Sequence, residues 1–475
     1  MKRAQTIPMR LLTHRVAAAS RMQLRGLASA PSQAYVTPTH TPYAKPSATA
    51  EATVARFKEY MLPVYDRPNF VLSHGKGSYM WDTDGNKYLD FSAGIAVNAL
   101  GHADEGVVKV ISEEAGKLIH TSNVYHNEWA PKLAESLVQL TRTGGGLGFQ
   151  NGESASGESI KVFFANSGTE ANEGALKMAR RYGKAVWAQS GGSEDACTKD
   201  HIVCFENSFH GRSMGALSVT SNPKYQKPFQ PLIPHVDVGK LNDIDALEQL
   251  ITENTCGVIV EPIQGEGGIN VPSEEWLRAL RKRCNDVNAV LIYDEIQCGL
   301  FRSGNIWAHS KLPVDCHPDI ITMAKPLANG FPIGALMAKD HVASPMGVGT
   351  HGTTFGGSPL SCAVGYHVVQ RLSNPKFVAE VAATSRHLDA RLSQVAKWYP
   401  GLVSEVRGRG LIRGLGFTDV SLPGKVVELA RERGVFFLTA GKDAVRLVPS
   451  LNVKKEEVDL AMDVLESCLH VVKEQ

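Results

Sequence analysis

The sequence predicts an α/β protein whose main domain contains a mostly parallel β-sheet. From about residue 160, short apolar runs alternate with longer segments that are compatible with helices, which is typical of parallel strands joined by crossover helices. Most of these runs end in a polar cluster, as expected where the carboxyl ends of strands form a ligand-binding edge. The predicted strands span residues 161–164, 201–206, 256–261, 289–295, 319–324 and 334–338.

A second, smaller domain is predicted because the pattern changes after about residue 360. A long helical stretch is followed by the run SEVRGRGLIRGLGF and then by a final helix that begins at about Lys455. Two segments that are rich in Gly and Ser, 144–159 and 188–200, are predicted to be surface loops. Neither ends in Gly-Lys-Ser/Thr, so neither is predicted to be a phosphate-binding loop.

The composition is that of a globular protein that binds neither membranes nor nucleic acids. The chain has 475 residues, of which 43% are hydrophobic and 21% charged, and no stretch approaches the roughly 18 consecutive apolar residues of a membrane span. The first 50 residues hold seven of the 50 Lys and Arg and none of the 48 Asp and Glu, so the rest of the chain has a net charge of −5. A mildly acidic body argues against nucleic-acid binding, which depends on basic patches.

The basic segment 1–30 is predicted to be a mitochondrial transit peptide. It has no acidic residue, and a helix would place five basic side chains on one stripe: Arg3, Arg10, His14, Arg21 and Arg25. A disordered basic tail is the alternative. The Ser-, Thr- and Pro-rich segment 31–50 is predicted to be a linker. We therefore expect the protein in the mitochondrial matrix.

The cysteines and histidines indicate no metal site and no disulfide framework. The eight cysteines are scattered without a C-x-x-C spacing, and the sequence lacks an H-E-x-x-H motif. Reduced, mostly buried thiols fit the mitochondrial matrix or the cytosol.

The segment NSGTEANEGALKMAR, which follows the first predicted strand, predicts an anion site. Ser167 and Glu170 have the spacing of a capping box, so a helix should begin here with Gly168 and Thr169 in its first turn. The free N–H groups and the positive end of the helix dipole suit a phosphate. An ordinary capped helix is the alternative.

Two further strand ends supply side chains for a planar, charged ligand. In NSFHGRSMGALS, Phe209 could stack on a heterocycle and Arg212 could bind a carboxylate through two hydrogen bonds. In AVLIYDEIQCG, Asp294 ends the most apolar strand, where a carboxylate is costly unless a cation such as a protonated pyridine meets it. Gln297 could hydrogen-bond a ring hydroxyl. A core position for Phe209 and a surface ion pair for Arg212 are the alternatives.

Lys325 stands at the end of the apolar run DIITMA and directly before Pro326, which prevents the strand from continuing. A lysine that simply points into water is the alternative. The cofactor that uses a phosphate site, an aromatic ring, a buried Asp and a lysine together is pyridoxal 5′-phosphate, whose aldehyde would form a Schiff base with Lys325. Asp294 would keep the ring nitrogen protonated, and Lys325 would carry the proton during transamination.

The chain resembles the class III pyridoxal-phosphate-dependent aminotransferases and, within that class, the acetylornithine branch. The resemblance covers about residues 55–470 and rests on motifs that occur in the expected order: NSGTEANE, FHGRSMGALS, PFQPL, EPIQGEGG, DEIQCG, MAKPLANGFPIGA and HGTTFGGSPLSCA. It implies the fold of aspartate aminotransferase-like enzymes, with a mainly parallel seven-stranded sheet, a smaller α/β domain built from both chain ends, and a homodimer with shared active sites. With this fold, residues 51–115 and 361–475 would form the small domain, and residues 116–360 the large cofactor-binding domain.

The resemblance also implies roles for single residues. Gly168 and Thr169 would bind the phosphate, Phe209 would lie against the ring, and Arg212 would hold the substrate α-carboxylate. Asp294 would pair with the ring nitrogen, Gln297 would contact the ring oxygen, and Lys325 would carry the Schiff base. In HGTTFGG, Thr354 would reach the phosphate of the partner subunit's cofactor and Thr353 would contact substrate.

The implied reaction transfers the δ-amino group of N2-acetyl-L-ornithine to 2-oxoglutarate in arginine biosynthesis, giving N-acetyl-L-glutamate 5-semialdehyde and L-glutamate. We expect Glu266 to neutralise Arg446 while acetylornithine reacts, and Arg446 to bind 2-oxoglutarate afterwards; a static ion pair is the alternative. FRSG at 301–304 replaces the GRTG that is usual in relatives, so we expect Phe301 to narrow the substrate entrance.

Two other functions remain open. The first is another class III ω-aminotransferase, acting on ornithine, 4-aminobutyrate or succinyl-diaminopimelate. The second is a non-catalytic scaffold, which the presence of Lys325, Asp294 and Arg212 disfavours.

Overall fold

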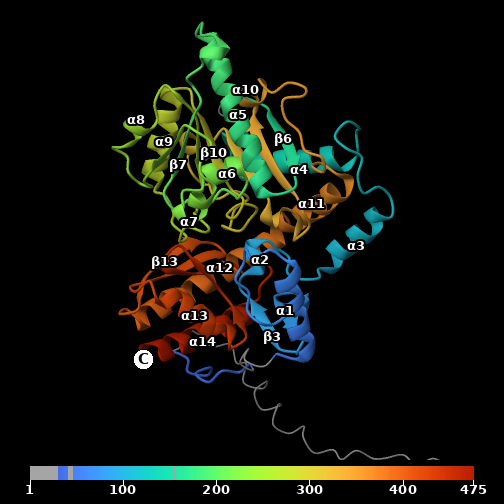
Figure 1. Ribbon diagram of the computed structural model, residues 1–475, viewed down its shortest axis with the longest axis vertical. Helices are drawn as coiled ribbons and strands as arrows, with labels where there is room; N and C mark the ends of the chain where they lie inside the picture. Colours follow the sequence, from blue (N-terminus) through green and yellow to red (C-terminus); the bar gives the residue numbers. More distant parts are fainter. Residues whose placement is uncertain (1–29, 41–45, 155–156, 475) are drawn as a thin grey trace, which may run out of the picture.

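The computed structural model describes residues 30–40, 46–154 and 157–474, which form a large domain and a small domain in contact with each other (Figure 1). The predicted transit peptide, residues 1–30, lies outside the described residues except for Ala30. Among the described helices, none has both the length and the apolar character that crossing a membrane requires.

The large domain is built on a seven-stranded sheet with the order β6-β12-β11-β10-β9-β7-β8. All strands are parallel except β12, which is antiparallel to both of its neighbours. The strands are β6 Ile160–Ala165, β7 His201–Phe205, β8 Val236–Gly239, β9 Thr255–Val260, β10 Val290–Asp294, β11 Ile320–Met323 and β12 Gly334–Lys339. The six strands predicted from the sequence are confirmed. The seventh, β8, is a short edge strand whose half-exposed VDVG lacks the apolar run of the others.

Helices cover both faces of this sheet, so its central strands are buried on both sides, as is usual for parallel sheets. The long helix α5 packs against β6, β9, β10, β11 and β12, and its apolar residues share a core with those strands. Between residues 93 and 398 the helices are α2 Ala93–Ala96, α3 Glu105–Ala115, α4 Trp129–Gly144, α5 Gly168–Gln189, α6 Met214–Ser218, α7 Pro223–Gln226, α8 Leu247–Leu250, α9 Glu274–Asp286, α10 Asp340–Ala343, α11 Pro359–Leu372 and α12 Pro375–Trp398. The last of these, α12, packs in the small domain. Single 3₁₀ turns are η1 Glu194–Ala196, η2 Lys227–Phe229, η3 Val314–Cys316 and η4 Lys325–Ala328.

The small domain contains the first and the last described segments of the chain, as expected, and Figure 1 shows the blue and red segments together. β3 pairs in parallel with β15, with Leu89 opposite Val435. The small domain has two four-stranded sheets, with the orders β1-β2-β3-β15 and β13-β14-β17-β16. The strands are β1 Leu72–Lys76, β2 Tyr79–Asp82, β3 Lys87–Asp90, β13 Val403–Arg409, β14 Ile412–Phe417, β15 Val435–Phe436, β16 Leu438–Ala440 and β17 Ala444–Leu447; further helices are α1 Ala48–Tyr60, α13 Leu422–Arg431 and α14 Lys455–Lys473.

Residues 31–40, within the segment predicted to be a linker, make specific contacts with the small domain. The backbone N–H of Ser32 donates to Glu466 at 2.7 Å, and Arg433 donates to the carbonyl oxygens of Tyr35 and Val36. The predicted linker also includes Ser47, which caps α1 by accepting from the N–H of Ala50.

The glycine-rich segment after α4 differs from its prediction as a surface loop, because residues 145–149 are buried. Gly145 and Gly146 have φ values of 93° and 132°, and a Cβ atom at Gly145 would lie 2.6 Å from the carbonyl oxygen of Ser310. Glycine adopts such backbone angles without strain and permits this close approach. The short hairpin of β4 Phe149–Gln150 and β5 Glu153–Ser154 follows.

Candidate active site

The polar clusters that follow five strands of the large sheet meet at one cavity of about 270 Å³. They come after β6, β7, β9, β10 and β11, as the sequence predicts. The lining residues are Ser167, Gly168, Thr169, Phe209, His210, Gly211, Arg212, Glu261, Asp294, Ile296, Gln297, Ala324 and Lys325. Every cluster therefore contributes at least one side chain to this cavity.

The amino terminus of α5 forms one wall of the cavity. Ser167 is the N-cap and accepts from the N–H of Glu170, so the helix begins at Gly168 as predicted. Among the described residues, the N–H groups of Gly168 and Thr169 have no acceptor. The Thr169 hydroxyl lies 2.7 Å from that of Ser213. These groups provide donors for an anion.

Asp294, the last residue of β10, is held on three sides. Its Oδ2 accepts from Nδ2 of Asn172 and from Nδ1 of His210, each at 2.8 Å, and its Oδ1 accepts from the N–H of Ile296 at 3.0 Å. Neither Asn172 nor His210 is predicted from the sequence as a site residue. The sequence offers one indication for Asn172, which is a polar residue at a position of α5 that faces the sheet.

Lys325 follows β11 and opens the turn η4, so its side chain lines the same cavity as Asp294. Burial lowers the pKa of Lys325, and repulsion from Arg446 lowers it further, against attraction from Asp294. A lowered pKa increases the fraction of neutral amine, which is the nucleophilic form.

Glu261 is a buried cavity residue that the sequence does not single out. Its carboxylate accepts from the N–H of Phe209 at 3.0 Å and from the N–H of Gly265 at 2.8 Å. Burial raises the pKa of Glu261 to about 7, and the negative charge of Asp294 adds to the rise. Glu261 thus ties the loop after β7 to the loop after β9.

Arg212 presents its guanidinium to the cavity between two aromatic rings. Its Cζ lies 3.6 Å from the ring centroid of Tyr225 and 5.5 Å from that of Phe209. Arg212 is exposed, and no hydrogen bond joins its guanidinium to another described residue. The N–H groups of the Arg212 guanidinium are therefore available to bind a carboxylate of a ligand.

Glu266 and Arg446 form an ion pair beside the cavity, with Nη2 of Arg446 3.1 Å from Oε2 of Glu266. The Arg446 side chain is 3% exposed and that of Glu266 36% exposed. Nη1 of Arg446 also donates to Oε1 of Gln297 and to the carbonyl oxygen of Gly265, each at 3.0 Å. The pair is thus joined to the cavity through Gln297.

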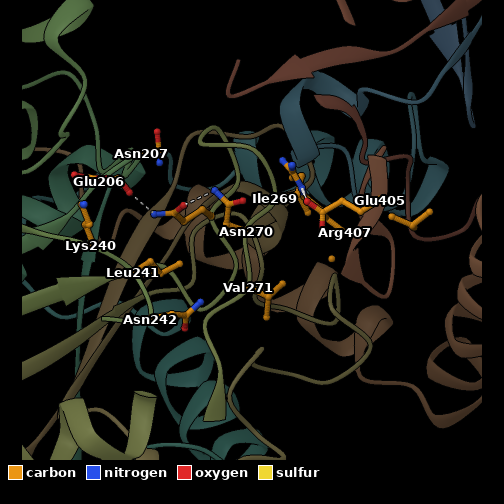
Figure 2. A pocket seen from close by; sticks show the side chains of 13 residues that line it. Glu206, Asn207, Lys240, Leu241, Asn242, Ile269, Asn270, Val271, Glu405 and Arg407 are labelled. Carbon is orange, nitrogen blue, oxygen red and sulfur yellow. Dashed lines mark hydrogen bonds and ion pairs between the residues drawn. The ribbon is translucent and has the colours of Figure 1, made fainter. Parts of the chain in front are cut away.

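A second, polar cavity of about 540 Å³ is lined in part by Ile269, Asn270 and Val271, which belong to the same loop after β9 as Glu266 (Figure 2). Arg407 binds both carboxylate oxygens of Asp443 and donates to the carbonyl oxygen of Gly268 at 3.1 Å. Asn270 donates to Gln264, which donates to the carbonyl oxygen of Glu206 at 2.8 Å. These contacts connect the loop to both domains.

The structure does not bring all predicted site residues to the cavity. Thr353 and Thr354 lie outside it: the Thr353 hydroxyl accepts from Asn166 at 3.0 Å, and Thr354 is exposed. The prediction that Phe301 narrows the entrance is wrong, because Phe301 is buried in the core with a φ of 69°. A turn in the loop after β10 directs its side chain inward.

Asp200, His201 and His235 form a group elsewhere with ligand atoms close enough for a metal ion. They lie at the amino ends of β7 and β8, which is the edge of the sheet opposite the cavity. Nδ1 of His235 contacts Asp200 at 2.9 Å, and Nδ1 of His201 contacts Asp237 at 3.0 Å. These carboxylates account for the orientation of both rings.

Comparison with known proteins places the chain in a family. The model of the family described as aminotransferase class-III matches residues 60–469. The mitochondrial acetylornithine aminotransferase of Neurospora crassa is 46% identical over 449 residues, which cover 94% of each chain. The solved ornithine aminotransferase of Toxoplasma gondii has a TM-score of 0.80 and 30% identity, covering 90% of this chain and 96% of its own. The solved N-acetylornithine aminotransferase of Stenotrophomonas maltophilia has a TM-score of 0.71 and 32% identity, with coverages of 89% and 99%.

These matches extend over both domains and include every strand that borders the cavity. The chain belongs to the class III aminotransferases.

Proposed function

We propose that this protein transfers the δ-amino group of N2-acetyl-L-ornithine to 2-oxoglutarate, with pyridoxal 5′-phosphate as cofactor, in arginine biosynthesis. The observation that carries the proposal is that Lys325, Asp294 and the free amides of α5 line one cavity. The name of the 46%-identical Neurospora crassa protein supports acetylornithine as the amino donor.

The residues of the cavity fit this cofactor. The N–H groups of Gly168 and Thr169 suit its phosphate, and Phe209 offers an aromatic face to its ring. A Cβ atom at Gly168 would lie 2.8 Å from Ile296, and one at Gly211 would lie 2.3 Å from the Thr169 hydroxyl, so both glycines allow the segments of the cavity wall to pack closely. When bound, pyridoxal phosphate supplies an electron sink for the charge left on the substrate carbon.

The chain's own residues supply the remaining chemistry. Asp294, oriented by Asn172 and His210, holds a proton on the ring nitrogen because a buried carboxylate strongly favours a cationic partner. Gln297 would contact the ring oxygen. Lys325 would hold the cofactor covalently through Nζ, and once the substrate amine has displaced it, the freed amine would carry the proton away from the reacting carbon and return it.

Arg212 selects the amino donor by binding its α-carboxylate. Acetylornithine reacts at its δ-amine, whereas glutamate reacts at a carbon that carries a carboxylate. We assign this second carboxylate to Arg446, which Glu266 neutralises while acetylornithine reacts. The high exposure of Glu266 beside a buried Arg446 supports a mobile carboxylate and an immobile guanidinium.

A panel of amino donors tests the substrate. Purified holoenzyme is assayed with acetylornithine, ornithine and 4-aminobutyrate, each against 2-oxoglutarate. We expect the highest kcat/KM for acetylornithine. Ornithine is the second candidate because the Toxoplasma gondii neighbour with a TM-score of 0.80 is an ornithine aminotransferase. A higher kcat/KM for ornithine would establish that function instead.

The active form in this proposal is a homodimer with shared sites. An exposed apolar surface next to Thr354 supports it: Val124 and Tyr125 are 77% and 72% exposed, and Phe355 is 61% exposed. Asn123 donates to the carbonyl oxygen of Thr353 at 3.1 Å, which joins these segments. A second copy that covers this surface would bring Thr354 to its partner's cofactor phosphate, and Thr353 to the substrate.

The proposed location is the mitochondrial matrix, in agreement with the name of the Neurospora crassa relative. Fusion of residues 1–30 to a fluorescent protein is expected to direct that protein to mitochondria. Replacing Arg10, Arg21 and Arg25 of the fusion by Glu removes the positive stripe, so import should be lost. Import that survives this change would contradict the transit-peptide assignment.

A further inference from the structure

Tyr225, on the short helix α7, contacts three residues that the proposed function uses. Its ring centroid lies 3.6 Å from Cζ of Arg212 and 6.0 Å from the ring of Phe209. Its hydroxyl donates to Oε1 of Glu266 at 3.4 Å. The other oxygen of the same carboxylate, Oε2, accepts from Arg446. Glu266 therefore lies between two donors.

The position of Tyr225 is set by its neighbours on α7. Asn222 caps this helix by accepting from the N–H of Lys224. Gln226 donates to the carbonyl oxygens of Leu217 and Ser218, at 3.1 Å each, and so attaches α7 to the end of α6. Burial raises the pKa of Tyr225, and the charge of Glu266 raises it further, so the hydroxyl keeps its proton.

We propose that the Tyr225 hydroxyl holds Glu266 after Arg446 is released to bind the carboxylate of 2-oxoglutarate or glutamate. Tyr225 is thereby a specificity-determining residue for that half of the reaction. The inference rests on the proposed function, because it assumes that Arg446 binds the second substrate.

The physical reason lies in the charge of Glu266. Once Arg446 binds the incoming substrate, an unpaired Glu266 would repel the substrate carboxylate. A donor on the far side of Glu266 both satisfies its carboxylate and keeps it away. The present separation of 3.4 Å would shorten by about 0.7 to 0.9 Å to reach the roughly 2.5–2.7 Å of a charge-assisted O–H···O hydrogen bond.

The ring and the hydroxyl of Tyr225 influence the binding of different substrates, so substitutions can separate the two effects. The ring stacks on Arg212 and so orients the group that binds the acetylornithine carboxylate. The hydroxyl contacts Glu266 alone among the described residues. Tyr225→Phe removes only the hydroxyl, and Tyr225→Leu removes both.

The test measures the two half-reactions separately with the holoenzyme by single-turnover absorbance. In one, the enzyme reacts with acetylornithine; in the other, the aminated enzyme reacts with 2-oxoglutarate. For Tyr225→Phe we expect kcat/KM for 2-oxoglutarate to fall about 10-fold to 100-fold, mainly through KM, which is the range for a lost hydrogen bond to a charged group. The value for acetylornithine should stay within about 2-fold, since the stacking on Arg212 is kept.

Three controls make the outcome decisive. Tyr182→Phe, on α5 and in contact with His341 away from the cavity, should change neither half-reaction. Tyr225→Leu should reduce both. In a Glu266→Gln background, Tyr225→Phe should lose most of its effect on 2-oxoglutarate, because no carboxylate remains to be held.

The inference is overturned if Tyr225→Phe leaves both half-reactions unchanged, or if it slows both equally. Failure of the proposed function is a separate result, seen in the wild-type enzyme. If another donor exceeds acetylornithine in the panel, that donor replaces it in the first half-reaction, and the ratio of variant to wild type still decides the role of Tyr225.

Discussion

Nδ1 of His210 lies 2.8 Å from Oδ2 of Asp294, and the two residues are 2% and 3% exposed. They come from the ends of β7 and β10, which are separated by β9 in the sheet. His210 and Asn172 together fix the carboxylate in an orientation that leaves it directed toward the cavity. The orientation of the Asp294 carboxylate is therefore set by three elements rather than by one strand.

Replacing the carboxylate of Asp294 by an amide should abolish most activity while the fold survives. In Asp294→Asn the ring nitrogen loses the charge that keeps it protonated, so we expect kcat to fall by at least about 100-fold, within the range for lost acid–base assistance. Steady-state kinetics measure this. Asp237→Asn is the matched control, because Asp237 also accepts a histidine contact but lies on the edge strand β8. An Asp294→Asn enzyme with near-normal kcat would exclude a role for Asp294 in the reaction.

Removing the amine of Lys325 should remove the covalent attachment of the cofactor and the activity together. In Lys325→Ala we expect the near-visible absorbance band of the wild-type enzyme to change and turnover to fall by more than about 100-fold, since the amine is both nucleophile and proton carrier. Absorbance spectra and the transaminase assay are recorded on the same sample. The exposed Lys311→Ala serves as the control and should retain both signals. An unchanged turnover rate in Lys325→Ala would show that another residue acts as nucleophile and proton carrier.

Stability should fall as the pH decreases from about 6.5 toward 3, because of His317. Its Nδ1 accepts from the N–H of Gly148 at 3.0 Å, and its Nε2 donates to the carbonyl oxygen of Leu312 at 2.9 Å, which fits a neutral ring. Burial, aided by repulsion from His309, lowers the pKa of His317 to about 3. Between that pH and about 6.5 the unfolded chain binds more protons, so the free energy of unfolding decreases by up to about 1.4 kcal/mol per pH unit as the pH falls.

Urea unfolding at several pH values and one protein concentration measures this dependence. His317→Gln should be less stable at pH 7 and have a shallower dependence on pH. His74→Gln, at an exposed position on β1, should keep the wild-type dependence. Equal slopes for the wild type and His317→Gln would mean that another group titrates.

A hybrid dimer of one Lys325→Ala subunit and one Thr354→Ala subunit should be more active than either parent dimer if Thr354 acts in the partner's site. We expect Lys325→Ala to be inactive and Thr354→Ala to be at least about 10-fold less active, as for the loss of one phosphate contact. In a hybrid of the two, one site combines an intact Lys325 with an intact Thr354. Activity after mixing, refolding and isolation of the hybrid should approach half that of the wild type.

A mixture of two Lys325→Ala samples, treated in the same way, is the control for recovery during refolding. A hybrid no more active than the mean of its parents would place Thr354 outside the shared site. A chain that stays monomeric by sedimentation would contradict the proposed dimer as well.

Local chemistry made much of the site predictable. Ser167 and Glu170 predict the start of α5 because an N-cap contact joins residues within one helical turn. Lys325 and Asp294 were predictable because each follows a continuous apolar strand, and parallel strands end at the same edge of the sheet. The edge strand β8 was not predictable, since its half-exposed VDVG has no apolar run. The burial of residues 145–149 was not predictable either, since it depends on distant partners such as Ser310.

By itself, the sequence determined six strands of the large sheet, the cap of α5, and the lysine and aspartate at the carboxyl edge, since these follow from the spacing of neighbouring side chains. Only the tertiary structure decided that His210 and Asn172 hold Asp294, that Glu261 joins two loops, and that Tyr225 reaches Glu266. Such contacts join residues dozens of positions apart, and no local periodicity encodes them. They form when the sheet aligns its strand ends, because a buried polar group must then find a partner among whatever side chains meet it there.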